Sequence, residues 1–218
     1  MGPWDIMSQH FVKKGEPPPG LSSFTKIRLG WITPKEARLI IPGETSLVLL
    51  SPLSQKGETL VIKIPLKDGR YYLIENRQPI GSDRMLPDSG ILILRVNPSA
   101  DEGYGTVEIV NADPKAAHFS HATFKLGESD RNRYIDKRND VSIIPLWKEK
   151  DELGVLITTP NESEMAIKAA SAIQKLIALT AHSDSNEKRK VLEKAVTSFK
   201  KFDFTGSYRI SQEIVGDE

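Results

Sequence analysis

Between residues 37 and 158, hydrophobic positions occur in short runs that are rich in β-branched and aromatic side chains. Runs of this kind predict strands when turn-forming residues separate them. We expect eight strands, at 37–41, 46–50, 60–64, 70–76, 90–96, 105–110, 141–147 and 154–158. The Asp68-Gly69 pair predicts a tight hairpin turn between the third strand and the fourth. Because no helical pattern interrupts the series, the sequence favours an antiparallel sandwich or barrel over an α/β fold.

Helical patterns flank the strands. On the N-terminal side, the apolar positions predict one short helix that begins at Ser22 or Ser23 and ends at Gly30. On the C-terminal side, Thr159 and Pro160 are typical of a helix start. One apolar stripe follows them, at Met165, Ala169, Ala172, Leu176 and Leu179. A second helix over 186–201 has an apolar face made of Leu192, Ala195, Val196 and Phe199, and the two helices predict an antiparallel hairpin.

The sequence therefore predicts a mainly β fold, with an antiparallel sandwich-like core, a short N-terminal helix and a C-terminal helical hairpin. Along the chain, we expect an N-terminal lead over 1–36, a β module over 37–158, the helical hairpin over 159–204 and a C-terminal tail over 205–218. Two short helices cannot form a core alone, so we expect the hairpin to cover an apolar surface.

Composition narrows the classes of function. The 218 residues include 30 Lys and Arg against 29 Asp and Glu, and this balance argues against a protein that binds nucleic acid by neutralising phosphates. No apolar run reaches the length of a membrane span, and the N-terminal residues do not resemble an export signal. The absence of cysteine excludes disulfides, cysteine zinc sites and a thiol nucleophile. We expect neither nucleic acid nor a membrane among the partners.

Four histidines are the first candidates for chemistry. His118 and His121 have the i, i+3 spacing of a metal-binding pair, and Asp113 is the nearest candidate for a third ligand. The polar loop around them favours the simpler interpretation, two surface histidines. His10 and His182 lie in polar segments and suggest no site.

The strand at 70–76 contains the next candidates. Glu75 and Arg77 share one face of the strand, because side chains alternate along it, and this spacing predicts a buried ion pair or a turn clamp. Four aromatic side chains could form a stacking platform for a sugar or a peptide, although aromatic residues in strands more often belong to the core. These four are Trp31, Tyr71, Tyr72 and Trp147.

Two stretches of the sequence share motifs with one known family. The first joins Met1–Ser8, with its Trp-Asp-Ile-Met-Ser turn, to Phe24–Ile32, which contains Leu-Gly-Trp. The second joins Tyr71–Gln78, which reads Tyr-Tyr-Leu-Ile-Glu-Asn-Arg-Gln, to Leu86–Ile93. Together they resemble the downstream portion of immune inhibitor A-type zinc metallopeptidases, in the family's order, over about residues 1–96.

The resemblance implies roles for several residues. Met7 would form the floor of the active site beneath the catalytic zinc without binding the metal, and residues 1–36 would be the methionine turn and the helix after the catalytic one. Lys26 and Leu29–Trp31 would hold that helix in place, and Glu75–Arg77 would stabilise the β module. The family's His-Glu-x-x-His helix has no counterpart in this chain, although zinc catalysis needs three protein ligands and a base. The family's histidine in its last block is replaced by Arg95.

We therefore expect the C-terminal portion of a zinc metallopeptidase that is inactive alone, with no catalytic residue, metal ligand or cofactor of its own; zinc is implied only for the complete family protein. The expected partners are the missing upstream catalytic half and a peptide or protein substrate, and the family implies an extracellular location. A truncated reading frame, a fragment and a module that has lost catalysis stay open. The alternative function is a stand-alone β-sandwich module that binds peptide or glycan.

Loss of an upstream half has a structural consequence. The first 20 residues should then be mobile, with the side chains of Trp4 and Met7 unburied.

Overall fold

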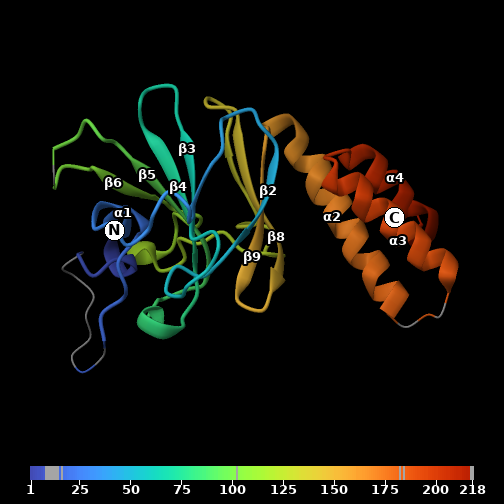
Figure 1. Ribbon diagram of the computed structural model, residues 1–218, viewed down its shortest axis with the longest axis horizontal. Helices are drawn as coiled ribbons and strands as arrows, with labels where there is room; N and C mark the ends of the chain where they lie inside the picture. The colour runs from blue at the N-terminus through green and yellow to red at the C-terminus, as the bar shows by residue number, and fades with distance from the viewer. Residues whose placement is uncertain (8–14, 16, 102, 182, 184, 217–218) are drawn as a thin grey trace. The chain divides into compact units, whose positions relative to one another are not determined.

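The protein is described here from a computed structural model, which covers residues 1–7, 15, 17–101, 103–181, 183 and 185–216 (Figure 1). It divides into two compact units, a β unit over Met1–Ile157 and a helical unit over Thr158–Glu218. Each unit has its own hydrophobic core. No helix of the described segments is long and apolar enough to cross a membrane.

Two sheets build the β unit. The five-stranded sheet has the order β1 (Ala37–Leu39), β3 (Val61–Pro65), β4 (Tyr71–Arg77), β5 (Gly90–Val96) and β6 (Val107–Val110). The four-stranded sheet has the order β2 (Ser46–Leu50), β9 (Glu152–Thr158), β8 (Val141–Glu149) and β7 (Tyr134–Asp136). Antiparallel pairing dominates both sheets, so the fold is mainly β and sandwich-like, as the sequence predicts.

The strand predictions differ from the structure in two respects. The sequence predicts neither β7, which has only three residues after a polar loop, nor the parallel pairing of β1 with β3. The predicted Asp68-Gly69 hairpin is confirmed: β3 and β4 pair antiparallel, and Gly69 adopts a φ of +82°. Such a φ suits glycine, which has no Cβ to collide with the backbone.

The five-stranded sheet is buried on both faces. On one face, Ile62, Ile64 and Ile74 join a cluster with side chains of the four-stranded sheet such as Val155 and Ile157. On the opposite face, Val61, Leu73 and Leu92 pack in a second cluster that contains Trp4 and Ile32 from the N-terminal segment. Figure 1 shows this segment and α1 beside the sheet, away from the strands of the second sheet. The N-terminal residues thus form a third layer of the β unit.

Short helical turns complete this layer and the loops. The helix α1 (Ser23–Arg28) begins after Ser22, whose hydroxyl accepts a hydrogen bond from the Thr25 amide, and the chain reverses at Gly30 with a φ of +72°. This confirms the predicted start and end. Three further turns are 3₁₀ helices: η1 (Gly2–Trp4), η2 (Gly81–Asp83) and η3 (Ala117–Phe119).

The helical unit contains three helices that pack on one another (Figure 1): α2 (Pro160–Ala181), α3 (Asn186–Lys200) and α4 (Phe204–Val215). The first two confirm the predicted hairpin and the predicted helix start at Pro160. The third helix occupies the segment expected to be a tail. The bundle therefore has a core of its own, in which Leu176, Val191 and Ala195 are buried.

The helix α4 corrects the predicted tail. Its buried residues are Phe204, Gly206, Ser207 and Ser211, and Ile210, Ile214 and Val215 pack against the core of the bundle, so the segment has an apolar face that the tail prediction overlooked. The predicted stripe on α2 is also wrong at its end, since Leu179 is exposed while Ala166 is buried. Small buried side chains on both helices let their backbones approach closely.

Gly154 in β9 offers a test of the packing within the four-stranded sheet. A Cβ atom at this position would collide with the indole ring of Trp147. We predict that Gly154→Ala destabilises the β unit by about 1–3 kcal/mol, as overpacking does, and that the cost falls in a Trp147→Leu background. Urea unfolding followed by tryptophan fluorescence measures this, because Trp4 and Trp31 also report on this unit. An equal cost in both backgrounds would contradict the proposed collision.

Candidate functional site

The segments that resemble the metallopeptidase family meet on the outer face of the five-stranded sheet. The turn at residues 4–7, the start of α1 and the end of β4 are far apart in the sequence, yet hydrogen bonds between buried groups join them.

Arg77 lies at the centre and is fully buried. Its Nη1 donates to Glu75 Oε1 at 2.8 Å and to the carbonyl oxygen of Trp4 at 2.9 Å. Its Nε and Nη2 donate to the two carboxylate oxygens of Asp83 at 2.9 and 3.1 Å. Although burial opposes the charge, the carboxylates of Glu75 and Asp83 raise the pKa of Arg77. The buried ion pair predicted between Glu75 and Arg77 is confirmed.

The two carboxylates also bind backbone amides of the N-terminal layer. Glu75 Oε2 accepts from the Ser23 amide at 2.7 Å, and Asp83 Oδ1 accepts from the Gly20 amide at 3.0 Å. The Ser23 amide is one of the free donors at the start of α1, where a negative charge is favourable. Arg77 therefore positions both carboxylates, and these in turn fix the segment that leads into α1.

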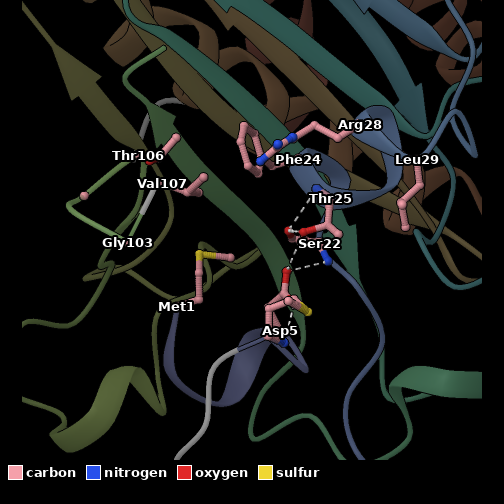
Figure 2. A pocket seen from close by; sticks show the side chains of 12 residues that line it. Met1, Asp5, Ser22, Phe24, Thr25, Arg28, Leu29, Gly103, Thr106 and Val107 are labelled. Atoms are coloured by element: carbon pink, nitrogen blue, oxygen red, sulfur yellow. Dashed lines mark hydrogen bonds between the residues drawn. The ribbon is translucent and has the colours of Figure 1, made fainter. Parts of the chain in front are cut away.

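Asp5 makes the second connection (Figure 2). Its Oδ1 accepts from the Met7 amide at 2.9 Å, which shapes the turn, and its Oδ2 accepts from the Ser22 amide at 2.9 Å. The dashed lines in Figure 2 also join Asp5 to Thr25 of α1. A single buried carboxylate thus ties the turn to the helix that follows it in the chain.

Lys26 anchors the other side of α1. Its ammonium group donates to the carbonyl oxygen of Leu53 at 2.5 Å. Burial lowers the pKa of Lys26, and the carboxylates of Asp83 and Glu75 offset this only in part. The lysine holds α1 near the loop after β2, which agrees with a role in positioning the helix.

Of the two side chains predicted to be unburied, Trp4 and Met7, only Met7 is exposed. Trp4 is fully buried, because its ring packs in the outer cluster and its Nε1 donates to the carbonyl oxygen of Phe119 at 2.7 Å. The prediction of an unburied Trp4 is therefore wrong. Met7 is 73% exposed, as predicted. The predicted mobility covers the first 20 residues, of which residues 8–14 and 16, His10 among them, lie outside the described part of the chain.

Met7 lines a pocket of about 600 Å³. Figure 2 shows its walls: Asp5, Ser22 and Thr25 on the side of α1, with Phe24 and Arg28 above them, and Met1, Thr106 and Val107 opposite. These side chains offer hydroxyl groups, one arginine and thioethers. Within the described ranges, no group of three histidine, cysteine or acidic side chains could hold a metal ion. The pocket can thus contact a ligand, but its own residues do not supply a zinc site.

The histidines of the loop before β7 lie on the surface. His118 and His121 are exposed, and His121 Nδ1 is 3.7 Å from Asp113 Oδ2. The candidate third ligand thus lies beside one histidine of the pair. His182 lies outside the residues that the structure describes.

The four aromatic side chains do not form one platform. Tyr72 is buried in the cluster between the sheets, whereas Tyr71 packs in the outer cluster, because neighbouring residues of a strand point to opposite faces. Trp31 is 63% exposed, and Trp147 packs over Gly154 in the other sheet.

Sequence reasoning missed Asp5 and Asp83 as members of the site. Asp83 lies in a Gly-Ser-Asp stretch whose composition is typical of a turn, and η2 does form a turn there. The available signal was the spacing: an acidic residue in the turn after a strand can reach back to an arginine at the end of that strand. Asp5 offered a similar signal, since aspartate often binds the amide two residues later.

The second resembling block contains another carboxylate, the partly buried Asp88. Its oxygens are 2.5 Å from Lys125 Nζ, 2.7 Å from Arg131 Nη1 and 2.8 Å from Thr123 Oγ1. These contacts attach the loop over 123–131 to the start of β5. Although burial works against it, the hydrogen bonds from these groups keep the pKa of Asp88 below its usual value.

Removal of Arg77 should leave two buried carboxylates without a countercharge. We predict that Arg77→Met lowers the free energy of unfolding of the β unit by about 3–5 kcal/mol. The matched control is Arg84→Met, an exposed arginine that should cost within about 0.5 kcal/mol. Urea titrations with tryptophan fluorescence compare the two. Equal stability of the two variants would refute the central role of Arg77.

Asp88 should make stability depend on pH. Because its folded-state pKa is lowered, its ionised form stabilises the protein above the unfolded-state value of about 4, and this contribution disappears as the pH falls through the folded pKa. We predict that Asp88→Asn destabilises the protein at pH 7 and that the difference from the wild type shrinks in acid. Thermal unfolding measured from pH 7 down to the acid limit of folding tests this. A pH-independent difference would contradict it.

The chain has no match among known proteins in three comparisons: no family model, no curated protein and no solved structure matches it.

Proposed function

We propose that the β unit is the non-catalytic downstream part of a zinc metallopeptidase, in which Met7 forms the floor of a zinc site whose ligands come from an upstream segment. One observation carries this proposal. The turn, the helix and the strand that resemble the family are joined by one network of buried hydrogen bonds around Arg77 and Asp5. The contact between these segments in the fold is the support for the proposal.

The geometry of the turn suits a floor that supports without binding. Asp5 fixes the backbone of Met7, Trp4 is clamped on the sheet, and the thioether of Met7 is left exposed at the pocket. An exposed apolar side chain on a fixed backbone can pack under a metal site contributed by another segment. In this proposal the chain alone supplies neither the three zinc ligands nor the general base that peptide hydrolysis requires.

The substrate class follows from the same proposal: peptides or proteins, cleaved by zinc-activated water in an extracellular setting. The alternative, a stand-alone module that binds peptide or glycan through its aromatic side chains, gains no support from Tyr71 and Tyr72, which face opposite sides of the sheet.

The proposal predicts activity only with the upstream segment present. The purified 218-residue chain with added zinc should not cleave labelled casein, whereas the chain produced together with the segment encoded upstream should cleave it in a chelator-sensitive way. In that complex, Met7→Ala should lower kcat/KM about tenfold, roughly 1.4 kcal/mol of transition-state stabilisation. Ile6→Ala is the matched control, an exposed residue of the same turn that should leave activity unchanged.

Two results would overturn the proposal. One is chelator-sensitive cleavage by the chain alone. The other is an upstream reading frame that encodes no His-Glu-x-x-His segment.

A further inference from the structure

A second pocket of about 480 Å³ opens between the two sheets of the β unit. Tyr72 and Arg95 reach it from the neighbouring strands β4 and β5, where they lie opposite each other. Tyr134 and Asp136 reach it from β7 of the other sheet. Its volume is in the range of small-molecule sites.

A directed chain of hydrogen bonds crosses the pocket wall. The Tyr72 hydroxyl donates to Asp136 Oδ2 at 2.8 Å and lies 2.8 Å from the Tyr134 hydroxyl. Because Tyr72 has one proton to give, Tyr134 is the donor in the bond between the tyrosines. Arg95 Nη2 in turn lies 3.5 Å from the Tyr134 hydroxyl. This series of hydrogen bonds thus runs from the Arg95 guanidinium through the two tyrosine hydroxyls to the Asp136 carboxylate.

The lining of the pocket is strongly basic. Its cations are Arg70, Arg95, Lys137 and Arg138, and its single carboxylate is Asp136. That carboxylate is already satisfied by the Tyr72 hydroxyl, the Asn139 side chain and the amides of Arg138 and Asn139. Asp68, which pairs with Arg70, offsets one further positive charge. An excess of two positive charges remains around the cavity.

Arg95 is a partly buried cation of this lining, on β5, and most of its donors are unused. In the described parts of the chain, no carboxylate pairs with it, and its cross-strand neighbour Glu108 is exposed, with an oxygen beside Gly105. A guanidinium group has five N–H donors in a fork that matches an oxyanion, and here only one long hydrogen bond and the ring of Tyr72 engage it.

We propose that this pocket binds a small anion with two or more negatively charged oxygens, such as a phosphate group or a dicarboxylate. Arg95 binds one oxyanion through two hydrogen bonds, and Lys137 and Arg138 attract the ligand at the rim of the pocket. The tyrosine pair holds the Asp136 carboxylate in a hydrogen bond, away from the ligand. The site is independent of the proposed peptidase function and uses none of its residues.

Calorimetric titration of the full chain tests this with inorganic phosphate and with succinate as separate probes. We expect saturable binding of at least one, with a dissociation constant below about 10 mM, that weakens at least about tenfold in Arg95→Gln and declines at higher salt. Preference for phosphate or succinate identifies the class of ligand. The matched control, Arg84→Gln, should bind as the wild type does.

Tyr134→Phe provides a second variant in case Arg95→Gln does not fold; it removes the hydroxyl next to Arg95 and should also weaken binding. Saturable binding that Arg84→Gln weakens as much as the pocket variants do would overturn the proposal. So would the absence of saturable binding of both probes to the wild type.

Discussion

The buried guanidinium of Arg77 is the group on which the rest of the β unit depends. A charge without water is costly unless its donors have partners, and Arg77 makes four hydrogen bonds, to Glu75, Asp83 and the backbone of Trp4. Each partner belongs to a different part of the fold: the same strand, the turn after it and the N-terminal layer. One charge therefore fixes the relative position of three segments.

The strand β4, which contains Arg77, has buried polar side chains on both of its faces. Glu75 and Arg77 point to the N-terminal layer, while Asn76 points between the sheets and donates to the carbonyl oxygens of Leu50 and Asp151. Gln78 extends this side by donating to Asn76. The alternation of the strand thus turns four consecutive polar residues into two separate buried networks, one for each neighbouring layer. This is why β4 tolerates polar residues at the centre of the unit.

The pattern of the sequence was sufficient for elements whose signal is local. The hairpin at Gly69, the helix start at Ser22 and the ion pair of Glu75 with Arg77 all follow from spacing, turn residues and strand alternation. It failed where the burial of a residue depends on distant partners. The loss of an upstream half predicts an exposed Trp4, but a sheet built from later residues covers it. The helix α4 was missed although Phe204 is buried in it and Ile210 and Ile214 pack against the core of the bundle.

By itself, the sequence determined the mainly β class, most of the strands and the first two helices of the bundle, because these depend on the spacing of hydrophobic residues and on turn-forming residues. It also determined which segments resemble a peptidase, because that depends on the order of motifs along the chain. Only the tertiary structure decided that those segments share one buried network, that Met7 is exposed on a fixed turn, and that Arg95 and the tyrosine pair meet across two sheets. The reason is physical: residues on different strands, such as Arg95 and Tyr134, come together only through long-range pairing and packing, and no local pattern records which distant partners will satisfy a buried polar group.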